Sequence, residues 1–364
     1  MNIDFANLKI AYQSHKNEFD KAIENVIKNA SYIMGPEIAL LEKTLSEYSN
    51  VKHSISCSSG TDALLLAMMS IDIKPGDEVI TSPFTFGATA ETIALLGAKP
   101  IFADIDEKTY NLDYKQIENK ITTKTRAIIA VSLFGQSADM DEINSIAEKH
   151  QLPVIEDAAQ SFGSTYKGRK SCALSTLSCT SFFPAKPLGC FGDGGAVFTN
   201  NQDLAEKLKS LRLHGQTNKH THKYIGLGAR MDTIQAAVLL VKLKHYSKDL
   251  QKRQKVADKY FKLLGDSVCV PFIKPQNTSV WAQFAIRVKN RNTIQQKLKE
   301  KGIPTAVYYP TPLHLQECFG YLNYKQGDFP ISEKVSKEIL SLPLNPFIKL
   351  EEQKFIVYEL KKIL

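Results

Sequence analysis

Two apolar segments near the middle of this sequence each end in residues that can do chemistry. The run Val154–Glu156 delivers Asp157, and the run that begins at Cys179 delivers Ser181 and then Lys186. An aldehyde cofactor with a pyridine ring needs such a pair. The lysine forms a Schiff base with the aldehyde, and the acid pairs with the protonated ring nitrogen, so the ring acts as an electron sink. The pair therefore indicates pyridoxal phosphate. A solvated loop lysine and an Asp that caps a helix are the alternative interpretation.

A small-residue turn offers a place for the phosphate of such a cofactor. The strand-like run Val51–Cys57 leads into Ser58–Asp62, and the helix-like run Ala63–Met69 follows. Free backbone N–H groups and the helix dipole make a turn of this kind an anion site. An ordinary Ser/Thr helix cap would show the same pattern. The need of Asp157 and Lys186 for a phosphate partner favours the anion site.

Length and composition favour a cytoplasmic protein with a large core. The chain has 364 residues, of which 43% are hydrophobic and 23% are charged, and such a length usually holds more than one domain. We expect no membrane segment and no secretory signal, because no apolar run is long enough and the first residues lack a basic head. The six cysteines are scattered without a Cys-x-x-Cys pair. We therefore expect reduced thiols in the cytoplasm and assign no residue to a metal.

The net charge of +8 does not indicate a nucleic-acid binder, because the lysines are spread along the predicted helices. One local cluster contains Lys219, His220, His222 and Lys223. We interpret the excess charge as mild steering of anionic small molecules, and we expect neither nucleic acid nor a membrane as a partner.

Helix-like and strand-like segments alternate along most of the chain. Helical periodicity predicts helices over residues 13–30, 36–48, 63–69, 113–120, 140–150, 204–211, 231–243, 246–264, 292–301, 332–340 and 351–362, with one more that ends near Gly97. Strands are predicted over residues 51–57, 78–82, 99–104, 127–131, 154–156, 280–288 and 305–309. Alternation with continuous apolar strands is typical of a parallel sheet covered by helices on both faces. Ligands of such sheets bind at the carboxyl ends of the strands, where Ser58–Thr61, Phe86, Gly135, Asp157 and Lys186 lie.

A change of pattern near residue 246 divides the chain. We predict a large α/β domain over residues 13–245, with a mostly parallel central sheet covered by helices. A smaller α+β domain follows over residues 246–364, and residues 1–12 pack on it. Residues 214–228 are polar and irregular, which predicts a long loop, and loops of this kind tend to carry function.

Six motifs resemble the sugar-nucleotide aminotransferase family, also called the DegT family. The match covers nearly the whole chain, in the order of the family. The motifs are Ser59–Leu64, Pro75–Ile80, Glu156–Gln160, Ser181–Gly189, Gly192–Gly195 and Arg230–Ala237. The resemblance implies a fold-type I pyridoxal-phosphate-dependent transferase that works as a homodimer with shared active sites.

The resemblance also implies roles for individual residues. Lys186 would be the Schiff-base lysine and Asp157 the partner of the ring nitrogen. Five further residues would contact the cofactor: Gly60, Thr61 and Ser181 at the phosphate, Phe86 on the ring face, and Gln160 beside the ring. The substrate-binding positions would be Tyr32, Ala185, Arg230, Tyr308 and Tyr309. The family commonly has Asn at the position of Gly228, where it reaches the phosphate from the partner subunit. Here either backbone or water replaces that contact, or the contact between subunits is weaker.

Within the family, the chain is similar to UDP-sugar 3-aminotransferases of surface-polysaccharide synthesis. The similar stretches are Ser171–Thr176, Cys179–Phe183 and Pro304–Pro310, although those enzymes usually carry His at the position of Tyr308. This resemblance implies transfer of the amine of L-glutamate to C3 of UDP-2-acetamido-2-deoxy-3-oxo-glucuronate, for lipopolysaccharide, O-antigen or another surface glycan. Pyridoxamine phosphate would be the intermediate form of the cofactor.

Several alternatives remain at this level. The acceptor could be a neutral dTDP- or UDP-linked 3- or 4-keto-deoxy-sugar. A non-catalytic sensor on the same fold has no need of Asp157, Ser181 and Lys186 together. The related sugar dehydratases carry His at the lysine position, so Lys186 counts against that activity. A decarboxylase or lyase on the same fold would be separated by a product assay.

Overall fold

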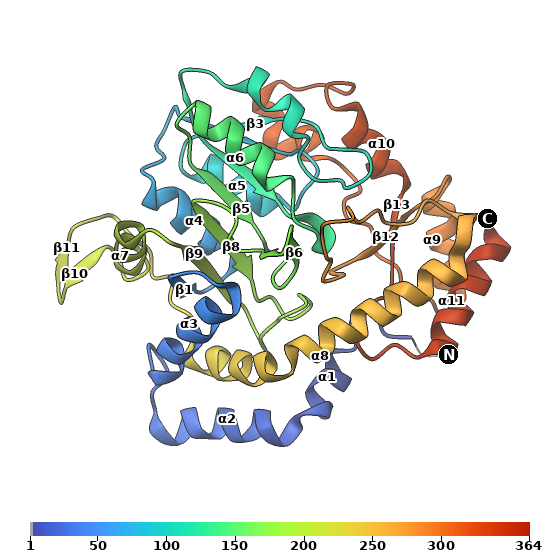
Figure 1. Cartoon of the computed structure of the whole chain (residues 1–364), viewed down its shortest axis with the longest axis horizontal. Helices are drawn as coiled ribbons and strands as arrows, with labels where there is room; N and C mark the ends of the chain where they lie inside the picture. Colours follow the sequence, from blue (N-terminus) through green and yellow to red (C-terminus); the bar gives the residue numbers. More distant parts are fainter. Residues whose placement is uncertain (1–2) are drawn as a thin grey trace.

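A seven-stranded sheet lies at the centre of the computed structural model, which describes residues 3–364 (Figure 1). Its strands are β1 (His53–Cys57), β2 (Glu78–Thr81), β3 (Lys99–Phe102), β4 (Thr125–Val131), β5 (Val154–Asp157), β8 (Leu177–Ser181) and β9 (Gly195–Thr199). Their order across the sheet is β1-β9-β8-β5-β4-β2-β3, and only β9 runs against its neighbours. The predicted α/β fold with a mostly parallel sheet is confirmed.

Helices cover both faces of this sheet because successive strand residues point to opposite sides. Val79 and Ile129 pack in a cluster with residues of α4 (Gly60–Ser70) and α5 (Gly87–Leu95), whereas Ile80 and Ile128 pack with residues of α6 (Met140–Lys149). The helices of this part are α2 (Lys16–Asn29), α3 (Pro36–Ser49), α4 (Gly60–Ser70), α5 (Gly87–Leu95), α6 (Met140–Lys149), α7 (Gln202–Leu211) and α8 (Thr233–Leu264). Among residues 3–364, no helix has the length and apolar character needed to cross a membrane.

A second hydrophobic cluster lies toward the end of the chain. It packs a two-stranded antiparallel sheet against two helices, over residues 291–300 and 350–363, and the second half of α8, and it includes Ile3. The elements of this part are β12 (Phe284–Arg287), β13 (Ile339–Leu342), α9 (Arg291–Glu300), α10 (Pro330–Glu338) and α11 (Leu350–Ile363). The side chains of Asn7 and Asn345 are joined by a hydrogen bond of 3.1 Å. Helix α8 runs without a break through residue 246, where we place the boundary between the domains. The division into two domains therefore stays a prediction. Of residues 1–12, which we expect to pack on this part, the first two lie outside the described residues.

Two short hairpins and one extra helix complete the described chain. Helix α1 (Leu8–Ser14) precedes α2, so the helix predicted over residues 13–30 begins later than expected. The hairpins are β6 (Thr165–Tyr166) with β7 (Arg169–Lys170) and β10 (Gln216–Asn218) with β11 (Thr221–His222). The β10–β11 hairpin extends away from the sheet (Figure 1). The predicted loop over residues 214–228 is therefore partly ordered by strand pairing.

Two predicted segments do not form the element that the sequence pattern indicates. The helix predicted over residues 113–120 is a pair of 3-10 turns, Tyr114–Gln116 and Glu118–Lys120. The strand predicted over residues 305–309 makes only one bridge, between Ala306 and Ser341. Prolines on both sides of this segment cannot donate ladder hydrogen bonds, and its apolar side chains pack against a cluster instead.

Candidate active site

Asp157 lies at the carboxyl end of β5, with 5% of its surface exposed. Its Oδ2 accepts a hydrogen bond of 2.8 Å from the Thr89 hydroxyl, and its Oδ1 accepts one of 3.2 Å from the backbone N–H of Ala159. Burial raises the pKa of Asp157, while the two hydrogen bonds and the charge of Lys186 act in the opposite direction. A positive charge beside this carboxylate would therefore stabilise its ionised form.

Lys186 lies in the loop after β8, next to Asp157 in the sheet order, and its side chain is half-buried. Burial lowers the pKa of Lys186, and the charge of Asp157 partly offsets this effect. Among residues 3–364, no hydrogen bond or ion pair engages its Nζ. Burial therefore favours the neutral form of this amine, and the residues that the structure describes offer it no partner.

The turn before α4 is shaped by a close approach to Ser181. A Cβ atom added at Gly60 would lie 2.6 Å from the Ser181 Cβ, so only glycine fits there without a shift. Ser59 caps α4 by accepting a 3.0 Å hydrogen bond from the N–H of Asp62. Within the described chain, this leaves the N–H groups of Gly60 and Thr61 without an acceptor. Two free N–H groups and a hydroxyl at a helix N-terminus suit a phosphate group.

The amide of Gln160 and two aromatic rings, of Phe86 and Tyr309, lie along the same edge of the sheet. The amide of Gln160 donates a 3.1 Å hydrogen bond to the Tyr309 hydroxyl, and its oxygen accepts one of 3.0 Å from the N–H of Phe134. The ring of Phe86 lies 6.5 Å from that of Tyr309 and is 61% exposed. An exposed ring at the start of α5 offers a free face on which a planar cofactor can stack.

Ala185, Lys186 and Tyr308 line one cavity. Its opposite walls come from the N-terminal segment with α1, from α8, and from the loop that contains Asn345. The structure therefore brings two of the predicted substrate positions beside the predicted Schiff-base lysine.

Tyr32 and Arg230 lie near the start of α8. The Tyr32 carbonyl accepts a 2.9 Å hydrogen bond from the N–H of Thr233, and the carbonyl of Ala229 accepts one of 3.2 Å from the N–H of Ser58. Arg230 thus follows Ala229, which is hydrogen-bonded to the turn before α4. The guanidinium of Arg230 is half-buried and has no ion pair among the described residues. No hydrogen bond joins either side chain to Asp157 or Lys186.

Gly228 and the exposed hairpin lie beside this region. A Cβ at Gly228 would lie 3.0 Å from the Cε1 of His214 and 3.6 Å from a terminal nitrogen of Arg230, so little room exists for a larger residue. The four basic residues of the loop, Lys219, His220, His222 and Lys223, are all exposed.

Sequence reasoning missed Thr89, which binds Asp157 directly. Its hydroxyl also lies 3.0 Å from the hydroxyl of Thr85, so the two form a short buried chain behind the carboxylate. The one available signal is the position of Thr89 in the first turn of the helix after β2, at the carboxyl edge of the sheet. Threonine in a helix usually bonds to its own backbone, so this signal is weak.

Comparison with known proteins identifies the group to which this arrangement belongs. A sequence profile of the DegT/DnrJ/EryC1/StrS aminotransferase family matches residues 13–361. The chain belongs to this family. Membership confirms the predicted family, the aminotransferase activity and the pyridoxal phosphate chemistry.

Relatives in this aminotransferase family match the chain over almost its full length. The UDP-2-acetamido-2-deoxy-3-oxo-D-glucuronate aminotransferase of Pseudomonas aeruginosa is 48% identical and covers 97% of this chain and 98% of its own. A pleiotropic regulatory protein of Geobacillus stearothermophilus is 45% identical, over 98% of this chain and 97% of its own. A dTDP-3-amino-3,4,6-trideoxy-alpha-D-glucose transaminase of Streptomyces venezuelae is 37% identical, over 95% and 92%.

Solved structures of family members share the fold. An aminotransferase of the family from Brucella abortus is 40% identical, covers 99% of both chains and has a TM-score of 0.95. NtdA from Bacillus subtilis, solved with bound cofactor PMP, is 31% identical, covers 99% of this chain and 85% of its own, and has a TM-score of 0.92. These similarities confirm the fold class predicted from the sequence.

Proposed function

We propose that this aminotransferase moves the amine of L-glutamate to C3 of UDP-2-acetamido-2-deoxy-3-oxo-glucuronate. The observation that carries the chemistry is the unpartnered, half-buried amine of Lys186 beside the buried carboxylate of Asp157. The acceptor rests on the relative from Pseudomonas aeruginosa, which is 48% identical and bears that substrate in its name.

The residues at the carboxyl edge fit pyridoxal 5′-phosphate. Gly60, Thr61 and Ser181 would hold the phosphate, Phe86 would stack on the ring, and Asp157 would pair with the ring nitrogen. Gln160 would lie beside the ring, where Tyr309 orients its amide. Bound there, the cofactor would supply a carbonyl for amine exchange and a ring that withdraws electrons from the substrate carbon.

Lys186 would move the proton of the reaction. Its lowered pKa increases the fraction of neutral amine near pH 7, which is the form that can accept a proton from the substrate carbon. The same group can return that proton as an acid in the next step. Asp157, held by Thr89 and Ala159, would keep positive charge on the ring nitrogen during both steps.

Arg230 would recognise carboxylates. Its guanidinium pairs with no acid among residues 3–364, and a planar fork binds a carboxylate in a bidentate manner. Glutamate presents a carboxylate in the first half-reaction, and a hexuronate presents one in the second. One arginine could therefore serve both substrates in turn. Tyr32, Ala185, Tyr308 and Tyr309 would contact the sugar nucleotide, with Tyr308 in place of the usual His.

A homodimer with shared active sites would complete this arrangement. The β10–β11 hairpin extends away from its own sheet, as expected of a segment that reaches a second subunit (Figure 1). Lys219, His220, His222 and Lys223 would then lie near the nucleotide phosphates bound by the partner, and backbone or water would take the place of the family's Asn at Gly228. We place the reaction in the cytoplasm, in synthesis of a lipopolysaccharide, O-antigen or other surface-glycan sugar.

The decisive experiment is a product assay of the purified enzyme with glutamate and a panel of keto-sugar nucleotides. We expect amination of the UDP-3-keto-uronate and a much larger loss with Arg230→Ala for this substrate than for neutral keto-sugars. The loss of a bidentate arginine–carboxylate pair from a partly buried site should cost about 2–5 kcal/mol of binding free energy. If the wild type prefers a neutral dTDP-linked sugar, the assignment of a uronate as substrate is refuted, whereas the assignment as an aminotransferase stands. No amination of any sugar would favour a regulator.

A further inference from the structure

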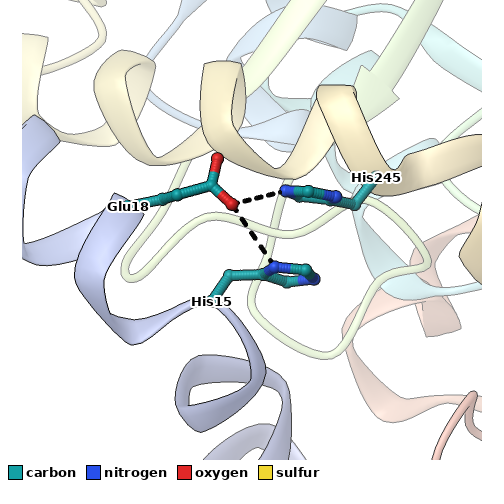
Figure 2. A group of neighbouring side chains, drawn as sticks. All are labelled: His15, Glu18 and His245. Carbon is teal, nitrogen blue, oxygen red and sulfur yellow. Dashed lines mark hydrogen bonds and ion pairs between the residues drawn. The ribbon is translucent and has the colours of Figure 1, made fainter.

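Two histidines and one glutamate meet where α2 lies against α8 (Figure 2). His15 precedes α2 as its N-cap, Glu18 lies in the first turn of α2, and His245 lies in α8. The Oε1 of Glu18 is 2.8 Å from the Nε2 of His245 and 3.5 Å from the Nδ1 of His15. No role in the transamination proposed above uses these three side chains.

The three ligand atoms lie close enough together to share one metal ion. One nitrogen from each histidine and one glutamate oxygen all lie within 4.8 Å of one another. A tetrahedral zinc ion, with bonds of about 2.0–2.1 Å, holds its ligand atoms roughly 3.3 Å apart. The distances from Glu18 to the two rings fall on either side of that value. We propose that His15, Glu18 and His245 form a zinc site, with water as the fourth ligand.

The arrangement of the rings defines what must change on binding. The imidazoles of His15 and His245 are stacked, with centroids 3.6 Å apart and planes 10° from parallel. A ring nitrogen binds a metal within its own plane, so at least one ring must rotate for both to reach the same ion. The two side chains are 27% and 23% exposed, which leaves room for such a rotation.

The surrounding charges act in both directions. Glu18 adds a negative charge, and Asp249 lies near enough to His15 to act on its pKa. Lys244 opposes a cation, because its Nζ lies 3.9 Å from the Oε2 of Glu18, and Lys252 acts in the same direction. Imidazole ligands favour zinc over magnesium or calcium.

Zinc at this position would connect two walls of the cavity beside Lys186. His15 and His245 both line that cavity, together with Ala185 and Tyr308. The metal would fasten α2, and with it the N-terminal segment, to α8. Its expected role is therefore to stabilise the cavity wall, without touching the reacting atoms.

The test is zinc binding to untagged holoenzyme, measured by equilibrium dialysis with metal analysis and by competition with a coloured chelator. We expect one zinc ion per chain, no competition from excess magnesium, and an affinity at least tenfold lower in Glu18→Gln and His245→Gln. His150→Gln is the matched control, because His150 pairs with Glu118 at 3.4 Å without a second histidine, and its affinity should equal that of the wild type. Lys244→Gln should bind zinc more tightly.

X-ray absorption of the zinc-loaded wild type tests the ligands without any substitution. Two imidazole ligands support the site, even where a ligand variant folds poorly. Retention of full affinity in both ligand variants, a spectrum without imidazole ligands, or no zinc binding by the wild type would each overturn the proposal.

Discussion

The hydroxyl of Thr89 offers a precise test of the electrostatics around Asp157. Replacement of Thr89 by Val keeps the shape of the side chain and removes the donor 2.8 Å from the Asp157 Oδ2. The carboxylate then retains one hydrogen bond, from the N–H of Ala159 at 3.2 Å. Because Asp157 is buried, water cannot replace the lost donor easily.

The expected size of this effect follows from the charge on the acceptor. A hydrogen bond to a charged group contributes about 1.5–3 kcal/mol. Its loss should therefore raise the pKa of Asp157 further, beyond the increase that burial already causes. If all of that free energy were lost in the transition state, the half-reaction with glutamate would slow by roughly 10- to 100-fold.

The assay is the single-turnover reaction of the holoenzyme with glutamate, followed by cofactor absorbance as a function of pH. Thr89→Val should slow this step and move its acidic limb to higher pH, whereas Thr89→Ser should restore the wild-type rate. Thr92→Val is the control, because the Thr92 hydroxyl donates to the Ala88 carbonyl at 2.8 Å within the same helix. Equal rates for the two valine variants would refute the reasoning.

Four further predictions test other parts of the structure. Lys186→Ala should abolish transamination but still bind pyridoxal phosphate, as measured by product assay and cofactor absorbance. Gly60→Ala should weaken cofactor binding at least tenfold in a fluorescence titration, because its Cβ would lie 2.6 Å from the Ser181 Cβ. Glu156→Gln should lower the free energy of unfolding by about 1–3 kcal/mol in urea and leave the half-reaction near normal. Burial lowers the pKa of Lys242 to about 8, from 10.5 in the unfolded chain. The unfolded state therefore binds more protons between these values, and stability should rise with pH there. Lys242→Met should remove that rise and stabilise the protein by about 3 kcal/mol at pH 7.

The sequence predicted the central sheet well because its strands are buried on both faces. Continuous apolar runs such as Ala127–Val131 have no competing helical period, and turns with Gly or Pro separate them from the helices. Strand β9 escaped prediction because it follows directly from Gly192–Gly195 and pairs antiparallel with two distant segments. Strand β13 was predicted as the end of a helix, since Ile339–Leu342 follows α10 without a turn signal.

The candidate site could be predicted where residue type alone carries the chemistry. Asp157 and Lys186 are unusual at strand ends, and the structure places them near enough for their charges to interact. Thr89 could not be found in this way, because its role depends on the approach of α5 to β5. The same holds for His15 and His245, which lie far apart in the sequence and meet only through helix packing. The functional roles assigned to the predicted site residues stay predictions.

Glu156 and Asp157 show how the fold assigns different tasks to neighbouring carboxylates. They point to opposite faces of β5, as successive strand residues must. Glu156 is fully buried and accepts four hydrogen bonds, from Ser132, Ser171, the N–H of Cys172 and Ser178. The acceptor positions of the Glu156 carboxylate are therefore filled within the protein. The carboxylate holds in place the segments that pack on that face of the sheet.

From the described part of the chain, the Asp157 side chain accepts only two hydrogen bonds, although it is almost equally buried. A carboxylate has about four acceptor positions, so Asp157 keeps capacity for a donor from outside the chain. An unfilled acceptor on a buried acid is costly unless a ligand completes it. The protonated nitrogen of the cofactor ring is a donor of the right charge. This difference in satisfied hydrogen bonds, which the sequence Glu-Asp does not reveal, is why we assign the ring nitrogen to Asp157 and a structural role to Glu156.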